Sequence, residues 1–354
     1  MRRRRPPGWR RGLRRLVALG AAMALTACSG LPCRFGAPAE FVSLGKNPFA
    51  VAQPTPVGRY LHTLEGWQGE LYMGYGDYDE NTGPIEVSAY NPRWSSYGTK
   101  LRFPTEAVEL FRPIGDRLYA PAIDPRGDGP SAAVAVGGPD GRWSNNKNVW
   151  MTHVFDVATF DGTDLWLVGS RKTQAIAVRS RDGGRTWETA LALEPRGADG
   201  DFARFHFVLV HGGRLYVQAQ DRRGGMFPRS NVFDGTGWTD GPNLRPIPNT
   251  GAKPLAVAGE TVYFGARGVM AFDGRAVRLA RPPQTRIYDL VVAEGILYVL
   301  DGREVLGTQD LAWWIPVATA PAGTTSIGVL DGYLYAGTVE SELFRYCRPV
   351  RPLR

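Results

Sequence analysis

The sequence has little of what most enzyme and metal sites require. Only three cysteines and four histidines occur in 354 residues, and their spacing is not that of a zinc site. A glycine-rich phosphate loop and a serine nucleophile elbow are both missing. No patch interleaves basic and aromatic residues, so nucleic acid is not an expected partner. These absences exclude the commonest motif-borne chemistries and leave ligand binding and carboxylate chemistry open.

Long apolar runs and amphipathic helices are also missing. The apolar stretch at residues 16–25 has about ten residues, whereas a membrane-spanning helix needs roughly 20. Between residues 40 and 347 no segment of useful length has helical periodicity. The sequence therefore predicts an all-β domain that follows a short apolar segment.

The first 27 residues have the pattern of an export signal. Eight arginines precede the apolar stretch, as in the n-region of a signal peptide. The stretch ends in Leu25-Thr26-Ala27-Cys28, which resembles the bacterial lipobox and implies cleavage before Cys28 and its acylation, for example with palmitate. Plain secretion with cleavage near Ala27 is the alternative. We expect a lipid-anchored linker at residues 28–40 and a location at the bacterial cell envelope, on a membrane and outside the cytoplasm.

The net charge of +8 belongs to this signal. The chain has 42 basic and 34 acidic residues, and removing the eight signal arginines leaves 34 of each. Net charge is therefore no indication of an acidic partner or of nucleic acid.

A short motif occurs seven times, with a Gly-containing turn, an apolar residue and then an aromatic one. The aromatic residues are Tyr72, Tyr119, Trp166, Tyr216, Tyr263, Tyr298 and Tyr335. Their spacings, between 35 and 50 residues, are typical of propeller blades, and each copy predicts two strands joined by a tight turn. We therefore expect a single seven-bladed β-propeller at residues 41–347 and a tail at 348–354.

One segment adds a family resemblance. Ser180-Arg181-Asp182-Gly183-Gly184-Arg185-Thr186-Trp187 resembles the Asp-box (BNR repeat), Ser-x-Asp-x-Gly-x-Thr-Trp, of sialidase-like propellers. The resemblance covers eight residues of one blade. It implies a turn between the two outer strands, with the tryptophan packed between blades, and it carries no activity.

The ends of the domain predict how the ring closes. The seventh blade has strands at residues 326–330, 333–337 and 342–347 but lacks an outer strand, which residues 40–43 would supply. Once Cys28 is acylated, Cys33 and Cys347 remain, one near each end of the mature chain. We expect them to form a disulfide at this seam, since the compartment permits it.

One position, ten residues ahead of each repeat aromatic, is polar in every copy. These residues are His62, Glu109, Asp156, His206, Lys253, Tyr288 and Thr325. Since the position two residues later is always apolar, we expect the polar residue to begin each inner strand and to line one mouth of the channel. Solvated side chains at a wet mouth are the alternative.

Long loops between second and third strands occur in blades one, two and four, and begin at Asp77, Asp124 and Asp221. Because loops carry most recognition, we expect an off-centre ligand site over blades one to four. Crowding Glu109 and Asp156 beside His62 and His206 would raise the histidine pKa values.

The first of these loops also suggests a metal. Asp77, Asp79 and Asn81 alternate as do the oxygen ligands of calcium loops. However, Gly83 comes one residue late, and Ser88 stands where a bidentate glutamate is expected. Bound Ca²⁺ is one hypothesis and a solvated acidic loop the other.

Two classes of function remain. The first is a non-catalytic, monomeric envelope propeller that binds a glycan, a peptide or an envelope protein. The second is a glycoside hydrolase of the sialidase-like kind, which needs an arginine triad. Arg112 is similar to an arginine of that family, and Arg204 and Arg286 could join a cluster near Tyr288, although nothing in the sequence places them with Arg112. Sialidases, however, have six blades and several Asp-boxes. Glu109 and Asp156, on adjacent blades, are the candidates for another catalytic carboxylate pair.

Overall fold

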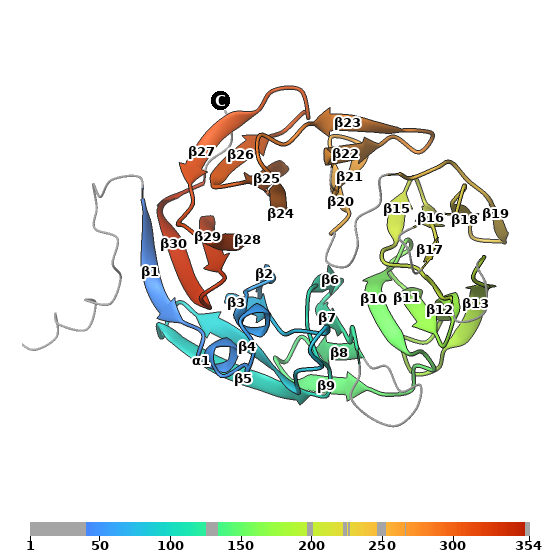
Figure 1. Ribbon diagram of the computed structural model, residues 1–354, viewed down its shortest axis with the longest axis horizontal. Helices are drawn as coiled ribbons and strands as arrows, with labels where there is room; N and C mark the ends of the chain where they lie inside the picture. Colours follow the sequence, from blue (N-terminus) through green and yellow to red (C-terminus); the bar gives the residue numbers. More distant parts are fainter. Residues whose placement is uncertain are drawn as a thin grey trace, which may run out of the picture. The chain divides into compact units, whose positions relative to one another are not determined.

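The computed structural model describes residues 40–124, 134–196, 201–221, 225, 227–245, 253–265 and 267–350. All of them belong to one compact unit, Ala37–Arg354. This unit is a ring of seven four-stranded antiparallel sheets, the blades (Figure 1), which confirms the predicted seven-bladed β-propeller. Within the described ranges no helix has the length and apolar character needed to cross a membrane.

Each of the first three blades is a meander of four consecutive strands. Blade 1 comprises β2 (Thr63–Trp67), β3 (Glu70–Gly74), β4 (Ile85–Asn91) and β5 (Ser96–Phe103). Blade 2 comprises β6 (Arg112–Ile114), β7 (Arg117–Pro121), β8 (Val134–Gly137) and β9 (Trp143–Asn146). Blade 3 comprises β10 (His153–Ala158), β11 (Leu165–Arg171), β12 (Gln174–Ser180) and β13 (Glu188–Leu193).

Blades 4 to 6 repeat this order. Blade 4 comprises β15 (Leu209–His211), β16 (Arg214–Val217), β18 (Asn231–Phe233) and β19 (Trp238–Asp240), and it is accompanied by a two-stranded ladder of β14 (Ala203–Arg204) and β17 (Gln220–Asp221). Blade 5 comprises β20 (Leu255–Val257), β21 (Glu260–Gly265), β22 (Gly268–Phe272) and β23 (Val277–Arg281). Blade 6 comprises β24 (Ile287–Ala293), β25 (Ile296–Asp301), β26 (Glu304–Thr308) and β27 (Ile315–Thr319).

Blade 7 joins the two ends of the domain. It comprises β28 (Thr324–Leu330), β29 (Tyr333–Thr338), β30 (Glu342–Pro349) and, as outer strand, β1 (Phe41–Lys46). Phe41 pairs with Tyr346, and Cys347 donates its backbone N–H to Glu40 O at 2.9 Å. The predicted N-terminal closing strand is therefore confirmed. Cys33 lies outside the described residues, so its pairing with Cys347 stays a prediction.

A short segment leads from the seam into blade 1. It contains α1 (Pro48–Val51) and η1 (Val57–Arg59). The buried Asn47 caps α1 by accepting from Phe49 N and Ala50 N, and Pro48 occupies the first turn, where no N–H is needed. Asn47 Nδ2 also donates to Ser88 Oγ at 3.1 Å, which attaches the segment to β4.

The ring has two faces with different loops. One face, here called the hairpin face, consists of the hairpins between first and second strands and the turns between third and fourth strands. The other, here called the mouth face, consists of the loops between second and third strands and the connectors between blades. Six of the seven hairpins have two-residue turns, whereas residues 159–164 separate β10 from β11 in blade 3. In blade 1 the turn residues Gln68 and Gly69 have φ of 50° and 74°, as a type I′ turn requires.

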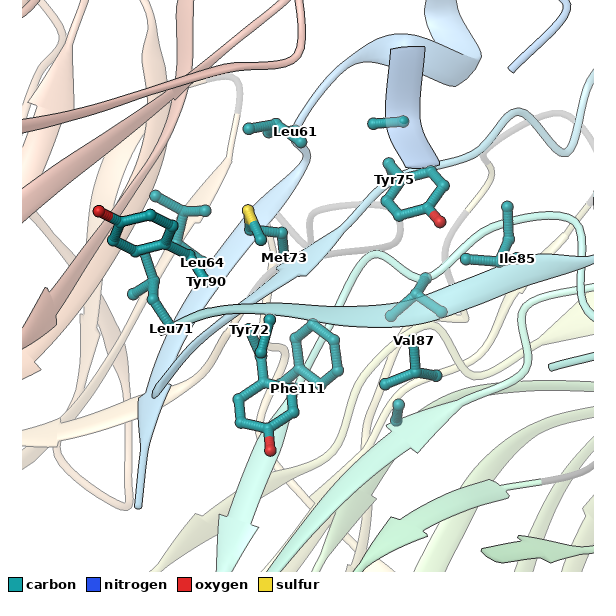
Figure 2. Packing of buried hydrophobic residues seen from close by; sticks show 14 of the residues in the cluster. Leu61, Leu64, Leu71, Tyr72, Met73, Tyr75, Ile85, Val87, Tyr90 and Phe111 are labelled. Carbon is teal, nitrogen blue, oxygen red and sulfur yellow. The ribbon is translucent and has the colours of Figure 1, made fainter. Parts of the chain in front are cut away.

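The repeat aromatics pack between blades. Tyr72 contacts Phe111 and Trp143 of blade 2, with ring centroids 5.9 and 5.3 Å apart; Figure 2 shows Tyr72 against Phe111. Five others likewise pack on the next blade: Tyr119, Trp166, Tyr216, Tyr298 and Tyr335. Large apolar area is buried at each contact, which stabilises the ring.

Blade 5 departs from the predicted repeat. Tyr263 stacks on Phe207 of the preceding blade, at 5.8 Å, and its hydroxyl donates to Leu244 O at 2.7 Å. Val262 occupies the contact with Leu290 of blade 6 instead. In blade 5 the residue that packs on the next blade is therefore Val262, one residue earlier than the aromatic spacing predicts.

The Asp-box forms the turn expected from the resemblance. Asp182 accepts from the backbone N–H groups of Arg185 and Thr186, and Trp187 Nε1 donates to Gly184 O at 3.2 Å. Hydrogen bonds from the Thr186 hydroxyl, from the Thr186 N–H and from Ser180 hold the pKa of Asp182 well below its usual range. Five other blades also have a turn between their third and fourth strands. In each of these turns an Asp or Asn side chain accepts from a backbone N–H of the turn: Asn91, Asp140, Asp234, Asp273 and Asp310. Sequence reasoning missed these five because none of their turns has the complete Asp-box pattern.

Candidate functional site

The centre of the channel is occupied by a buried ion pair. Arg112 of β6 donates from Nε and Nη2 to the two oxygens of Asp156 on β10, at 2.9 and 3.0 Å. Its third nitrogen, Nη1, donates to Pro254 O beside β20 at 2.9 Å. Asp156 also accepts from Val157 N and Val208 N. The pair therefore joins blades 2, 3 and 4 and reaches blade 5.

A second buried pair repeats this arrangement. Lys253 Nζ lies 3.5 Å from Asp289 Oδ1 and 3.3 Å from Leu64 O of blade 1. Asp289 accepts from Leu290 N at 2.8 Å and from Ile327 N at 3.0 Å, the same two kinds of contact that Asp156 makes. Burial raises the pKa of Asp289, and Lys253 partly opposes that rise.

Glu65 of β2 adds a third carboxyl group to the centre. Burial raises its pKa to about 7, against the opposing charges of Lys253 and Arg112, and Asp289 raises it further. Glu65 keeps some accessible surface. Sequence reasoning missed Glu65, although its register, directly opposite the repeat aromatic Tyr72, was a usable signal.

The seven polar residues ten places ahead of the repeat aromatics do not lie in one layer. The expectation that all seven line one mouth of the channel is therefore wrong. In blades 1 and 2 the residue opposite the repeat aromatic lies seven places before it. In blade 3 the longer hairpin increases this separation to eight residues, since Ala158 pairs with Trp166. In blade 5 Leu255 pairs with Val262 and not with Tyr263. Asp156 and Lys253 therefore stand one position further along their strands than the other five residues. This shift places them among the buried central pairs, with Asp289 as the equivalent in blade 6.

The remaining aligned residues lie nearer the mouth face. His62 Nε2 bonds to Gly76 O at 2.9 Å, and Thr325 Oγ1 of blade 7 donates to Leu61 O, just ahead of β2 in blade 1, also at 2.9 Å. Glu109 is half-buried between β5 and β6. Tyr288 lines a cavity of about 460 Å³ between blades 6 and 7, together with Asp301, Arg303 and Thr324.

An aromatic and cationic group, here called the mouth cluster, stands at the start of blade 3. It consists of His153, Phe155, Arg204 and His206. The Phe155 ring is stacked between His153, at 5.6 Å, and His206, at 4.8 Å. The Arg204 guanidinium lies 5.7 Å from the Phe155 ring and 4.2 Å from Phe202. The segment is positioned by Ala203 and Phe205, whose N–H groups donate to Thr173 O and Gly169 O of blade 3.

The electrostatics of this cluster contradict one expectation. Burial lowers the pKa of His206 to about 3, and the charges of Arg204 and His153 lower it further. The predicted rise is therefore wrong for His206, because no carboxylate lies close enough to offset its desolvation. Burial also lowers the pKa of Arg204, against Asp124 and Tyr78. Among the described residues Arg204 Nε and His206 Nδ1 have no hydrogen-bond partner.

The acidic loops have separate structural roles. Asp124 Oδ1 lies 3.3 Å from His153 Nε2, and His153 Nδ1 lies 2.6 Å from Ser170 Oγ. Asp77 is buried, and its carboxylate accepts from Thr55 Oγ1 and from the N–H groups of Asp79 and Glu80. Most of the loops that begin at Asp124 and Asp221 lies outside the described residues.

The calcium hypothesis is not supported by this geometry. In the part of the chain that the structure describes, no three His, Cys, Asp or Glu side chains are placed to hold a metal ion. The Asp77 carboxylate instead organises its own loop, so Asp79 and Asn81 do not combine with it as a ligand set.

The arginines proposed for a sialidase-like triad have three different environments. Arg112 is bound to Asp156 in the channel, Arg204 lies over Phe155, and Arg286 lies over Tyr288 at 5.0 Å. Asp156 is saturated with hydrogen bonds, so it is not available as one half of a catalytic carboxylate pair with Glu109.

A further cavity of about 680 Å³ lies between blades 2 and 3. It is bordered by the hairpin at Gly115, by Asn145 of β9 and by the Asp-box turn at Asp182. Sequence reasoning did not anticipate this cavity, because its walls come from two separate blades that meet only in the folded ring.

Comparisons with known proteins give the fold and no family. No protein-family model and no curated protein matches the chain. The structure of selenomethionine-substituted virginiamycin B lyase from Staphylococcus aureus is similar, with a TM-score of 0.56, 9% identity, and coverage of 86% of this chain and 98% of that chain. The Pan2 WD40 domain of Neurospora crassa is also similar, with a TM-score of 0.53, 9% identity, and coverage of 87% and 95%. These names describe different functions, and at such identity the likeness shows the propeller fold alone.

Proposed function

We propose that the chain is an exported, lipid-anchored envelope propeller that binds a carboxylate-bearing glycan, peptide or protein at the mouth cluster, without catalysis. The observation that carries the proposal is the environment of Arg204. Its guanidinium is held over Phe155 and Phe202 and keeps some accessible surface. Among the described residues it is in no ion pair and its Nε has no hydrogen-bond partner, and burial lowers its pKa although Asp124 opposes this change. A ligand carboxylate would supply a counter-charge in direct hydrogen-bond contact.

The neighbours of Arg204 favour a ligand with a flat apolar surface. Phe155 itself is buried in its stack with His153 and His206. The half-buried Phe202 ring beside the Arg204 guanidinium is the aromatic face that a sugar ring or an apolar side chain would contact. His206 is neutral at ordinary pH because its pKa is lowered to about 3. It therefore adds polarity to the cluster without a second positive charge.

Binding assays on the mature full-length protein test the proposal. The probes are uronic-acid oligosaccharides, their neutral counterparts, and peptides whose C-terminal carboxylate is either free or amidated. We expect carboxylate probes alone to bind, and Arg204→Ala to weaken binding at least about tenfold, the cost of a lost charged hydrogen bond. Arg214→Ala, an exposed arginine of β16 on the hairpin face, is the matched control and should bind as wild type.

Two results would reject the mouth cluster as the site. One is equal affinity of wild type and Arg204→Ala for a carboxylate probe. The other is a preference for the neutral or amidated probes. Melting temperatures within a few degrees of wild type must accompany any loss, so that unfolding is not mistaken for lost binding.

The sialidase-like alternative receives less support from the site. Its arginines lie apart and its carboxylate candidate Asp156 is saturated by Arg112 and two backbone N–H groups. Release of sugar from sialosides or uronides by the wild-type protein would favour hydrolysis over simple binding.

A further inference from the structure

Two exposed tryptophans occupy the same position in two different blades. Trp94 is 68% exposed and Trp313 is 77% exposed. Each donates its backbone N–H to the Asx residue three places earlier, Asn91 or Asp310. Both therefore project from the turn between third and fourth strands, on the hairpin face.

Tryptophans that follow the same turn in other blades pack inward. Trp143 of blade 2 lies 5.3 Å from the Tyr72 ring, and Trp238 of blade 4 lies 5.8 Å from the Trp166 ring. Trp187 of blade 3 bonds to Gly184 O. Exposure is thus specific to blades 1 and 6, the two blades that flank blade 7 (Figure 1).

The described chain also begins on the hairpin face. β1 runs antiparallel to β30, with Phe41 beside Tyr346. The far end of β30 lies at a hairpin, since Val350 N donates to Gly332 O at 2.8 Å. Strand β1 therefore starts on this face of blade 7.

Blades 7 and 1 share one orientation, so their hairpins lie on the same side. The first halves of their inner strands meet where Ser326 Oγ donates to Leu61 O at 2.6 Å. Their last parts meet where Gly66 lies against Val329 O. The hairpin face is therefore continuous from Phe41 to Trp94.

We propose that this part of the hairpin face rests on the lipid bilayer, with Trp94 and Trp313 at the membrane interface. The inference rests on the proposed lipid anchor. Eleven residues lie between Cys28 and Glu40, so the tether reaches at most about 40 Å. Tryptophan favours the interface because its ring is apolar and its N–H is polar.

The opposite orientation is less favourable. With the mouth face toward the membrane, the tether would have to run back along blade 7, whose strands are roughly 25 Å long, and both tryptophans would point into water. Exposed charges of both signs occur near this face, among them Arg93, Glu294, Asp310, Asp331 and Arg348. Docking therefore depends on the tryptophans and not on anionic lipid, and the mouth cluster faces away from the membrane.

Quenching of tryptophan fluorescence by brominated phosphatidylcholine tests the inference. The lipidated mature protein is reconstituted into vesicles of neutral lipid, with or without the brominated acyl chains. We expect quenching in wild type and loss of most of its amplitude in the double variant Trp94→Phe, Trp313→Phe. Trp150→Phe is the matched control, because Trp150 is 67% exposed but stands in the connector ahead of β10, on the mouth face. It should keep the full quenching.

Unchanged quenching in the double variant, or loss of quenching in Trp150→Phe, would overturn the inference. So would quenching confined to vesicles with anionic lipid, or a change of oligomeric state in the double variant without a change in quenching. The intact mass of the same sample shows whether Cys28 is acylated. An unmodified Cys28 refutes the proposed anchor, whereas an acylated protein without quenching refutes the docking surface alone.

Discussion

Arg112 and Asp156 form a two-pronged ion pair in the middle of the channel, and the remaining Arg112 nitrogen bonds to Pro254 O. Pro254 belongs to blade 5, which is not a neighbour of blade 2 in the ring. The contact therefore connects opposite parts of the ring through its centre. Together with the Lys253–Asp289 pair, this contact occupies the centre of the channel. Polar inner-strand residues alone would instead suggest an open, solvated channel.

Asp156→Asn should destabilise the fold. The substitution leaves the buried Arg112 without a counter-charge, which typically costs about 3 to 5 kcal/mol of unfolding free energy. Glu188→Gln removes an exposed pair with Arg181 and should cost less than about 1 kcal/mol. Denaturant unfolding of both variants provides the measurement. A stability of Asp156→Asn equal to that of wild type would mean that the pair does not hold the ring together.

Glu65 should make stability fall as pH rises. Its pKa is raised from 4.5 to about 7 in the folded protein, so the folded state holds a proton between these values that the unfolded state has lost. Stability therefore decreases from pH 4.5 to 7. Glu65→Gln should remove this decrease and should unfold at higher denaturant than wild type at pH 8. Glu304→Gln, at an exposed glutamate of β26, is the control. A Glu65→Gln profile parallel to that of wild type would contradict the prediction.

Cys28 should be the first residue of the mature protein. The lipobox resemblance motivates this expectation, which the described residues do not test. Intact mass of the membrane-extracted protein should correspond to a chain that starts at a diacylated or triacylated Cys28, and Cys28→Ser should not be acylated. A soluble mature protein with another first residue would show plain secretion instead.

Cys33 and Cys347 should be linked at the seam. Cys347 N donates to Glu40 O, and only six residues lie between Glu40 and Cys33, so Cys33 is near enough along the chain to reach Cys347. A disulfide between Cys33 and Cys347 would close a loop of more than 300 residues. Such a closure contributes about 5 to 6 kcal/mol in the loop-entropy model, and measured gains are often smaller. Peptide mapping without reductant should identify the linked peptides, and Cys33→Ser should lower the unfolding free energy. Two free thiols in the native protein would exclude the link.

The amino-acid sequence by itself determined the architecture of this protein. Alternating apolar residues and Gly-containing turns are local signals, so Gly69 and its six counterparts predicted seven hairpins. The closing strand at Phe41 was predictable as well, because a sheet with three strands needs a fourth to cover its edge.

Only the tertiary structure decided which polar side chains meet. One longer hairpin in blade 3 and the packing of Val262 in place of Tyr263 shift Asp156 and Lys253 by one position, and no count along the sequence detects this. Arg112 and Pro254 are 142 residues apart in sequence, and they meet because the ring closes. The pKa values of Glu65 and His206 likewise depend on desolvation by neighbours from several blades. Charge in the centre of a propeller is set by the assembled ring, because each blade contributes one strand to it and no blade surrounds it alone.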